Sequence, residues 1–383
     1  TCNNNNYSSN TNQSMLLTNN AMNQQFDEMI SRLQVTSNYT LNENDIIGIG
    51  AFGKVYRGTY QHKDVAIKQS LVLDEEARET LKKEMLIHHQ LSANVGVVRL
   101  LGIDISHPHK PLSIILELAD FSLYDVLHSR HHNQNSVRRS LTSPMMDVMD
   151  MSILGKLSIM IQIASAMVYI SALEIIHRDI KSSNVLIFNT SQSQNHHLPE
   201  AKICDFGITK TANSKDTFHQ THTPKGTPAY MAAETWRGEY SQFSDIYAFG
   251  VMLNETFAEE EPLKDLKSSN TIMYEVTNNQ RRPKMFTIKQ LFNHDDDIQL
   301  LNFLKSQQQD NNVDKEIEAI LKENIILKSW DQDPSRRPMF LHILSDLELI
   351  FKLVAQKNDE FKQHQHQRQL QEASLVDSFE PTM

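Results

Sequence analysis

Alternating hydrophobic and polar positions divide the chain into a strand-rich first part and a helix-rich second part. Short runs of β-branched residues bounded by glycine or polar clusters predict strands. The stretches that fit this pattern are Ile46–Tyr56, Asp64–Lys68, Val97–Ile103 and Ser113–Leu118. A small sheet is therefore expected in the first part of the chain.

The helical pattern begins with Asp74–Leu91, in which Leu81, Met85 and His88 share one face. Beyond about residue 121 helices dominate, and Leu154–Leu173 is the longest and most apolar of them. The apolar run Ile159–Ile176 contains polar residues, whereas a membrane span needs about 20 nearly unbroken apolar positions. We therefore expect a buried helix and no membrane span.

Changes of composition set the expected domain boundaries. Residues 1–40 are expected to be an Asn-rich, disordered leader, and its first 25 residues are too polar to offset their ordering entropy. Residues 41–351 form one domain with lobes 41–119 and 120–351, and residues 352–383 are a polar tail, either disordered or helical. Three polar segments look like inserted surface loops: 128–152, 189–200 and 293–313. Because the chain begins with Thr1, we expect a processed or fragmentary product.

The formal net charge of −10 argues against a general binder of nucleic acid or anionic membranes. Two cysteines, Cys2 and Cys204, cannot form a disulfide framework, so the composition fits a reducing compartment. No charged segment followed by an apolar core opens the chain, which gives no secretory signal. These features together predict a cytoplasmic protein.

Two motifs carry the candidate chemistry: His177-Arg178-Asp179-Ile180-Lys181-Ser182-Ser183-Asn184, and Asp205-Phe206-Gly207 downstream of it. They supply a carboxylate that can accept a hydroxyl proton, a cation near it and two separate oxygen ligands for magnesium. Phosphoryl transfer needs these groups, since its transition state is stabilised by positioning and charge. Their order and spacing together indicate a phosphoryl-transfer site.

A glycine-rich segment, Gly48-Ile49-Gly50-Ala51-Phe52-Gly53-Lys54-Val55, precedes these motifs. Glycines allow the backbone to approach phosphates closely, and Phe52 at the tip can cover them from water. Such a motif alone could equally be a dinucleotide-binding loop. Here it leads into a strand and not a helix, which disfavours the dinucleotide alternative.

Lys68 follows in the apolar run Val65-Ala66-Ile67-Lys68, so we expect a site lysine and not a surface one. A lysine that binds phosphate groups in such a site requires a carboxylate that orients it. Glu84 is the best candidate, and Glu76 and Glu79 remain open as rivals.

These motifs and their order resemble the eukaryotic protein kinase domain over about residues 41–351. The details Lys181-Ser182-Ser183-Asn184, Asp245-Ile246-Tyr247-Ala248-Phe249-Gly250-Val251 and Trp330 before Asp333-Pro334-Ser335-Arg336-Arg337-Pro338 are similar to the tyrosine-kinase-like group of serine/threonine kinases. The Asn- and Gln-rich inserts look like those of amoebal proteins. The resemblance implies an α+β, two-lobed fold with a small antiparallel sheet and one helix in the first lobe and a mainly helical second lobe.

The resemblance also implies roles for individual residues. Asp179 is the expected catalytic base, Lys181 is expected to reach the γ-phosphate of ATP, and Lys68 to hold the α- and β-phosphates. Asn184 and Asp205 are the implied Mg²⁺ ligands. The implied ATP contacts are Ile47, Gly48, Ile49, Gly50, Ala51, Phe52, Gly53, Lys54, Val55, Ala66, Lys68, Glu84, Glu117, Ala119, Leu186 and Asp205. Leu116 takes the gatekeeper place, although a plain buried strand end remains open there.

A peptide-docking segment is implied at Gly226–Glu234, where Thr227 is expected beside Asp179 and Lys181. The chain departs from the family pattern at Ala233, where kinases usually have proline. Glu234 is expected to pair with Arg337, and Asp245 to anchor the catalytic-loop backbone.

We therefore expect a kinase that transfers the γ-phosphate of ATP to Ser or Thr of protein substrates. A tyrosine or dual-specificity kinase and a nucleotide-binding pseudokinase remain alternatives. Arg178 before the catalytic aspartate is typical of kinases switched by phosphorylation in the activation loop. Thr217, Thr221 and Thr223 are the candidate sites, modified by the same kinase or one upstream, and an unmodified Thr-rich loop is the other possibility.

Overall fold

The computed structural model describes residues 24–35, 39–50, 53–70, 75–105, 111–128, 151–188, 198–211, 224–306 and 313–377. The chain forms two compact units. Unit 1 is Thr1–Ala119 together with Cys204–Thr209, and unit 2 is Asp120–Ile203 together with Lys210–Met383. A short segment from late in the sequence, which contains Asp205, therefore belongs to unit 1.

Unit 1 contains a five-stranded antiparallel sheet in the order β1-β2-β3-β5-β4. Its strands are β1 (Tyr39–Gly50), β2 (Gly53–Tyr60), β3 (Lys63–Ser70), β4 (Leu100–Asp104) and β5 (Ser113–Glu117). The stretch 46–56, expected as one strand, spans two, because the chain reverses between Gly50 and its partner Gly53. The strand expected at Val97 begins later, at Leu100.

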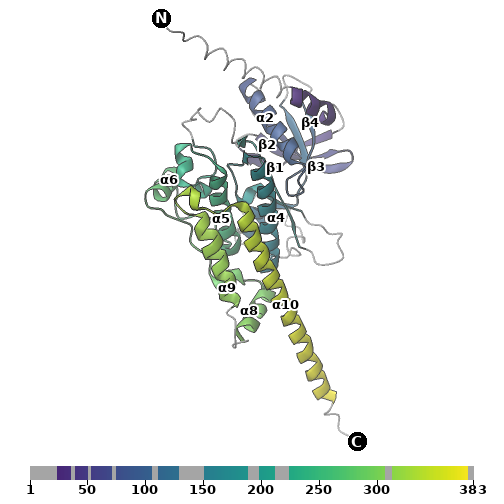
Figure 1. The fold of residues 1–383 in the computed structure, drawn as a ribbon. Coiled ribbons are helices and arrows are strands. Elements are labelled where there is room, and N and C mark those ends of the chain that lie inside the picture. The colour runs from purple at the N-terminus through teal and green to yellow at the C-terminus, as the bar shows by residue number, and fades with distance from the viewer. Residues whose placement is uncertain are drawn as a thin grey trace. The chain divides into compact units, whose positions relative to one another are not determined.

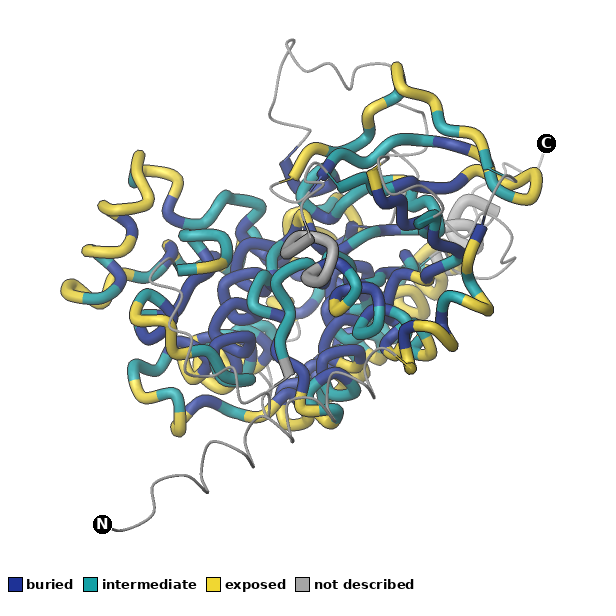
Figure 2. The backbone as a smooth tube through the Cα atoms, turned by 90° about the horizontal axis from the view of Figure 1, so that it is seen from above, coloured by how far each residue is buried: buried dark blue, intermediate teal, exposed yellow. Residues whose placement is uncertain are grey.

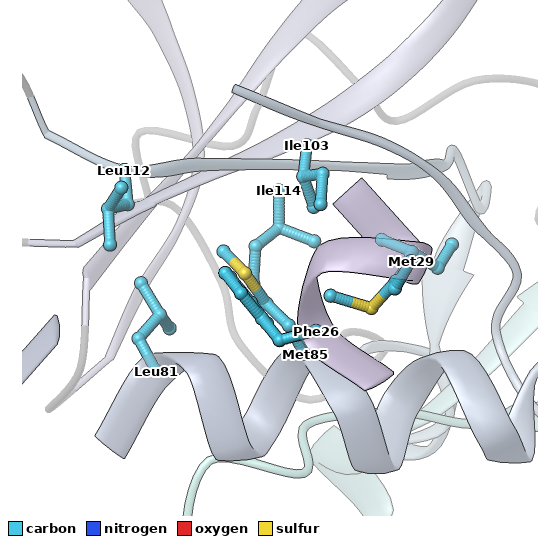
Figure 3. Packing of buried hydrophobic residues seen from close by; sticks show 8 residues of the cluster. Phe26, Met29, Leu81, Met85, Ile103, Leu112 and Ile114 are labelled. Atoms are coloured by element: carbon cyan, nitrogen blue, oxygen red, sulfur yellow. The ribbon is translucent and has the colours of Figure 1, made fainter. Parts of the chain in front are cut away.

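Helix α2 (Glu75–Leu91) accompanies the sheet, as the sequence predicted. Residues 24–33 form a further helix, inside the range assigned to the leader. Phe26 and Met29 are three residues apart, so they share one side of this helix. They pack into an apolar cluster with Leu81 and Met85 of α2 (Figure 3). Burial of these side chains stabilises the helix, which composition alone did not indicate.

Unit 2 is mainly helical (Figure 1). Its α-helices are α3 (Leu123–His128), α4 (Ile153–Ala172), α5 (Gln242–Ala258), α6 (Ser269–Thr277), α7 (Ile288–Leu291), α8 (Asp295–Ser306), α9 (Val313–Ala319) and α10 (Phe340–Asp377). A π-helical stretch, Ile320–Leu327, continues α9, and 3-10 turns lie at Ser182–Asn184, Pro228–Tyr230, Ala233–Arg237 and Pro334–Arg336. The short strands β6 (Phe121–Ser122), β8 (Val185–Phe188) and β9 (Glu200–Ile203) pair together, as do β7 (Ile175–Ile176) and β10 (Lys210–Thr211).

Helix α4 is the core of unit 2, as expected from its apolar sequence. It is long and apolar enough to cross a membrane by length and composition, but 61% of its most apolar window is buried inside the protein. It also contains a fully buried lysine, Lys156, which is ion-paired with Glu259 at 2.8 Å. Figure 2 shows buried positions gathered inside the helical unit and exposed ones on its outer turns. These features are those of a core helix.

The inserts differ from one another in the structure. Most of the inserts 128–152 and 189–200 lies outside the described residues. Strands β8 and β9, which flank the insert 189–200, pair as an antiparallel hairpin. The segment 293–313, expected as a surface loop, contains helix α8 instead. Leu300, Leu301 and Leu304 are buried along one side of α8, and this apolar stripe stabilises it.

The polar tail also begins within a helix. Helix α10 continues across residue 352 to Asp377, which matches the helical alternative for this segment. Phe361 of α10 packs against Phe303 of α8 with ring centroids 5.3 Å apart. Figure 1 shows the last part of α10 continuing beyond α8.

Candidate active site

The glycine-rich segment forms the end of β1 and the start of β2. Ile47, Gly48, Ile49 and Gly50 lie on β1, and Gly53, Lys54 and Val55 on β2. Ala51 and Phe52, expected at the tip, lie outside the described residues. Ile49 is 73% exposed, an unusual position for a large apolar side chain in a sheet. The hairpin therefore offers an apolar surface that a ligand could cover.

Lys68 on β3 is held between two carboxylates of unit 1. Its Nζ donates to Oε1 of Glu84 at 2.7 Å and to Oδ1 of Asp205 at 2.9 Å. Burial alone would lower the pKa of Lys68, but the two negative charges outweigh it and raise the pKa above its ordinary value. Lys68 is therefore a fixed cation, and Glu84 is its carboxylate on α2. The side chains of the rivals Glu76 and Glu79 lie outside the described residues.

Asp205 and Phe206 also belong to unit 1. Asp205 has a φ of +65°, a conformation that costs free energy outside glycine and clusters at functional sites. The ring of Phe206 lies 5.0 Å from the ring of His88 on α2. Nε2 of His88 lies 2.7 Å from the Val98 carbonyl and donates to it, so α2 is tied both to Phe206 and to the loop before β4.

Asp179, the expected base, lies in unit 2 within a set of polar groups. The hydroxyl of Thr227 donates to its Oδ1 at 2.7 Å, and Nζ of Lys181 lies 2.7 Å from its Oδ2. Lys181 also donates to Thr227 Oγ1 at 2.8 Å. The three side chains therefore form a closed triangle that fixes the carboxylate.

Asn184 is oriented by hydrogen bonds to Asp179. Its Nδ2 donates to the Asp179 carbonyl at 2.8 Å and to Oδ2 at 3.1 Å. With the amide nitrogen so engaged, the side-chain oxygen of Asn184 is the atom suited to a cation. The expected metal-ligand role is compatible with this orientation.

Asp245 anchors the backbone of the catalytic loop, as the sequence predicted. Its carboxylate accepts the N–H groups of His177 and Arg178 at 2.7 and 2.8 Å. Burial raises the pKa of Asp245 to about 7, although both hydrogen bonds oppose the shift. Arg178 has a φ of +72°, so these hydrogen bonds hold a strained loop.

Arg178 lines a pocket together with Asp179, Thr227, Tyr240 and Asp245, among others. Its guanidinium stacks 4.4 Å from the centre of the Tyr240 ring. Burial lowers the pKa of Arg178, and burial followed by the charge of Arg178 lowers that of Lys225. Within the described part of the chain, the buried Nε of Arg178 has no hydrogen-bond partner. Two neighbouring cations are thus available to an anion.

The expected ion pair between Glu234 and Arg337 is present. Nη1 and Nη2 of Arg337 donate to the two carboxylate oxygens at 2.6 and 3.1 Å. Gly226, at the start of the docking segment, has a φ of +123°, and a Cβ there would lie 2.9 Å from the Arg178 carbonyl. Only glycine therefore fits between this segment and the catalytic loop.

Sequence reasoning missed a buried network around Glu255 of α5. Its Oε1 lies 2.9 Å from Nε2 of His128 and accepts from Ser182 Oγ at 2.9 Å, while its Oε2 accepts from Tyr230 Oη at 2.6 Å. The network connects α3, the catalytic loop and the docking segment. The available signal was a glutamate close behind the apolar run Ala248–Leu253 of α5, since fully buried glutamates are almost always paired.

The residues implied for the adenine end are placed as follows. Glu117 ends β5, where its side chain accepts the N–H of Arg99 at 2.7 Å, and Ala119 follows it in unit 1. Leu116 is paired with Ala66 across β5 and β3. Leu186 lies on β8 of unit 2. These backbone positions agree with the expected elements.

The side chains fit magnesium better than a transition metal. Among the described residues there is no cluster of three His, Cys, Asp or Glu that could hold a metal ion. Asn184 and Asp205 offer oxygen atoms only, and Mg²⁺ characteristically uses one or two carboxylates with phosphate oxygens and water. Each of the two side chains is therefore suited, by its own oxygen chemistry, to Mg²⁺.

The sequence is also similar to those of known proteins. Residues 41–347 match the family model described as protein tyrosine and serine/threonine kinase. A probable serine/threonine-protein kinase of Dictyostelium discoideum is 31% identical over 304 residues, covering 78% of this chain and 26% of that protein. One from Arabidopsis thaliana is 27% identical over 316 residues, covering 82% and 25%.

A dual specificity protein kinase of Dictyostelium discoideum is 27% identical over 324 residues, covering 84% of this chain and 50% of that protein. The chain thus spans between a quarter and a half of the length of these relatives. Residues 41–347, which match the family model, contain the glycine-rich segment and the catalytic motifs.

Proposed function

Because the chain belongs to the protein tyrosine and serine/threonine kinase family, we propose that it is an ATP- and Mg²⁺-dependent kinase that phosphorylates Ser or Thr on proteins. The triangle of Asp179, Lys181 and Thr227 carries this proposal. It combines a positioned base with a lysine and a threonine that are typical of serine/threonine kinases. The relatives named as serine/threonine kinases support the same specificity.

The residues of unit 1 bind and orient the nucleotide in this proposal. Lys68, fixed by Glu84 and Asp205, is the cation for the α- and β-phosphates. The hairpin of β1 and β2 provides the glycine backbone, and Ala66, Glu117 and Ala119 the adenine end. ATP would supply the γ-phosphoryl group and Mg²⁺ would neutralise the phosphates; Asp205 of unit 1 and Asn184 of unit 2 are the residues proposed as Mg²⁺ ligands.

Asp179 receives the proton of the substrate hydroxyl. Thr227 and Lys181 orient its carboxylate, so the carboxylate needs no reorganisation when the substrate hydroxyl binds. General-base assistance of this kind contributes about 10²–10⁴-fold to the rate. The cation of Lys181 stabilises negative charge beside the same carboxylate.

Incubation of the full chain with γ-labelled ATP, Mg²⁺ and a generic basic protein tests this function. Label on Ser or Thr is expected, and it should disappear in the D179N variant. D64N is the matched control, since Asp64 is an exposed aspartate on β3. ATP binding without transfer in the wild-type chain would instead support a pseudokinase.

A dual-specificity kinase is the second candidate, and the related dual specificity kinase from Dictyostelium favours it. Phosphoamino-acid analysis of the same reaction separates the two. Label on tyrosine as well as on Ser or Thr would replace the first proposal with the second.

Activation-loop phosphorylation is part of the proposal. Arg178 and Lys225 form a positively charged site beside Tyr240. A phosphothreonine carries a charge of about −1.5 to −2, which would form ion pairs with these two side chains. The candidates Thr217, Thr221 and Thr223 lie outside the described residues. Phosphatase treatment should lower activity, and full activity after it would contradict the switch.

Four further assignments belong to the proposal. The chain is placed in the tyrosine-kinase-like group on its catalytic-loop sequence, and its substrates are proteins. The same kinase or an upstream one is the partner that modifies the activation loop. A cytoplasmic location is proposed from the cysteine content, and imaging of the tagged protein checks it.

A further inference from the structure

The helix at residues 24–33 covers an apolar stripe of α2. Phe26 and Met29 are only 6% and 2% exposed. They pack with Leu81 and Met85 of α2 and with a group of residues from β4, β5 and the segment before it: Leu100, Ile103, Leu112 and Ile114. Figure 3 shows Phe26 beside Met85, with the short helix lying against α2. The apolar face of α2 is therefore completed by residues that precede the first strand.

The segment is anchored at its end by the sheet. Gln34 forms a parallel bridge with Ile103, and the N–H of Val35 donates to the Ile103 carbonyl at 2.8 Å. Val35 is buried in the cluster of Val65, Ile67 and Ile115. Residues 24–35 are thus fixed at two places, one on α2 and one on β4.

Gly102 of β4 provides independent evidence for this docking. A Cβ at this position would lie 2.6 Å from Cγ2 of Val35 and 3.4 Å from the Leu33 carbonyl. At 2.6 Å a Cβ would force the Val35 side chain to shift, so the absence of a side chain at Gly102 makes room for Val35.

The covered stripe of α2 lies next to its site-facing stripe. Leu81 and Met85 are four residues apart and share one side of the helix, while Glu84 and His88 share the adjacent side. Glu84 binds Lys68 at 2.7 Å, and His88 contacts Phe206. A rotation or shift of α2 that exposed Met85 would also move Glu84 away from Lys68.

We propose that residues 24–35 are a positioning segment, in which Phe26 and Met29 hold α2 where Glu84 engages Lys68. The inference rests on the proposed kinase function, because it assigns the segment a part in assembling that site. Phe26 and Met29 contact no reacting group and act through Glu84. The matched control is Arg32, whose side chain is 67% exposed on the same helix and pairs with Glu28.

The first test is amide hydrogen exchange of the full chain. In F26A the amides of residues 82–90 in α2 should exchange at least about tenfold faster, because the cavity removes packing from one side of the helix. R32A should exchange like the wild type. Unchanged exchange of α2 in F26A would overturn the proposal. Should F26A fail to fold, G102A is the second variant, since it displaces Val35 while leaving Phe26 in place.

The second test is a double-mutant cycle on phosphoryl transfer. F26A should lower kcat/KM about tenfold in the wild-type background and less than about twofold in the E84Q background, since the effect passes through Glu84. Equal losses in both backgrounds would show general destabilisation and overturn the proposal. A wild-type chain without phosphoryl transfer would refute the kinase function alone, and the exchange of α2 would then decide the role of the segment.

Discussion

Arg337 donates two hydrogen bonds to the carboxylate of Glu234, although the two residues are 103 positions apart. The guanidinium is 1% and the carboxylate 8% exposed, so the pair is shielded from water. Arg337 also donates to the carbonyls of Asp331 and Phe243 at 3.0 and 2.8 Å. The pair therefore joins the end of the docking segment to α5 and to the turn before α10.

R337A should destabilise the protein by about 3–5 kcal/mol, because it leaves the charge of Glu234 buried without a partner. The midpoint of urea denaturation measures this. R336A, next to it, should change stability by less than about 0.5 kcal/mol, since Arg336 is 73% exposed. Similar losses in the two variants would contradict the importance of the buried pair.

K68M should lower the rate of phosphoryl transfer at least about 100-fold, the usual effect of removing a group that stabilises developing charge. The loss of the cation also leaves Glu84 buried alone, so rates are compared below the unfolding temperature of the variant. K63M, at the exposed end of the same strand, is the control. A K68M rate within threefold of the wild type would exclude Lys68 from the site.

T227V should lower kcat about 10–100-fold, because the hydrogen bond to the charged carboxylate of Asp179 contributes about 1.5–3 kcal/mol. The KM for ATP should stay unchanged, since Thr227 belongs to the docking segment. T227S keeps the hydroxyl and should retain most of the activity. Steady-state kinetics with both substrates varied measures this, and an unaffected kcat in T227V would contradict the triangle as a working unit.

His88 should make the protein less stable in mild acid. Burial, aided by the charge of Lys68 and opposed by the hydrogen bond to Val98, lowers the pKa of His88 to about 4 from 6.5. The unfolded chain then binds a proton between these values while the folded chain does not, so stability falls as pH decreases from about 6.5 to about 4. At pH 5 the loss should be about 2 kcal/mol.

H88L removes the titrating ring and should flatten this part of the stability profile. Urea denaturation at pH 7.5, 6 and 5 measures the slope. H89L, the neighbouring substitution, leaves His88 in place and serves as the control. An equal slope in H88L and the wild type would assign the acid sensitivity to other groups.

The sequence by itself determined the elements and the chemistry of the site. β-branched runs predicted the strands of the first sheet, the apolar period predicted α2 and α4, and the motifs around Asp179 and Asp205 indicated phosphoryl transfer. These signals are local, since strand and helix periods and the spacing of catalytic groups are read within short stretches. The pairing of Glu234 with Arg337 was also expected, through the family resemblance.

Tertiary structure decided what depends on partners distant in sequence. Polar composition suggested a disordered leader and a loop at 293–313, yet Phe26, Met29 and the leucines of α8 form helices because other elements bury their apolar sides. Glu255 became the centre of a network only when α3, the catalytic loop and the docking segment met around it. Contacts with distant elements decide whether such helices and buried charges are stable. The free energy that stabilises a marginal helix or a buried charge comes from contacts that no short stretch of sequence contains.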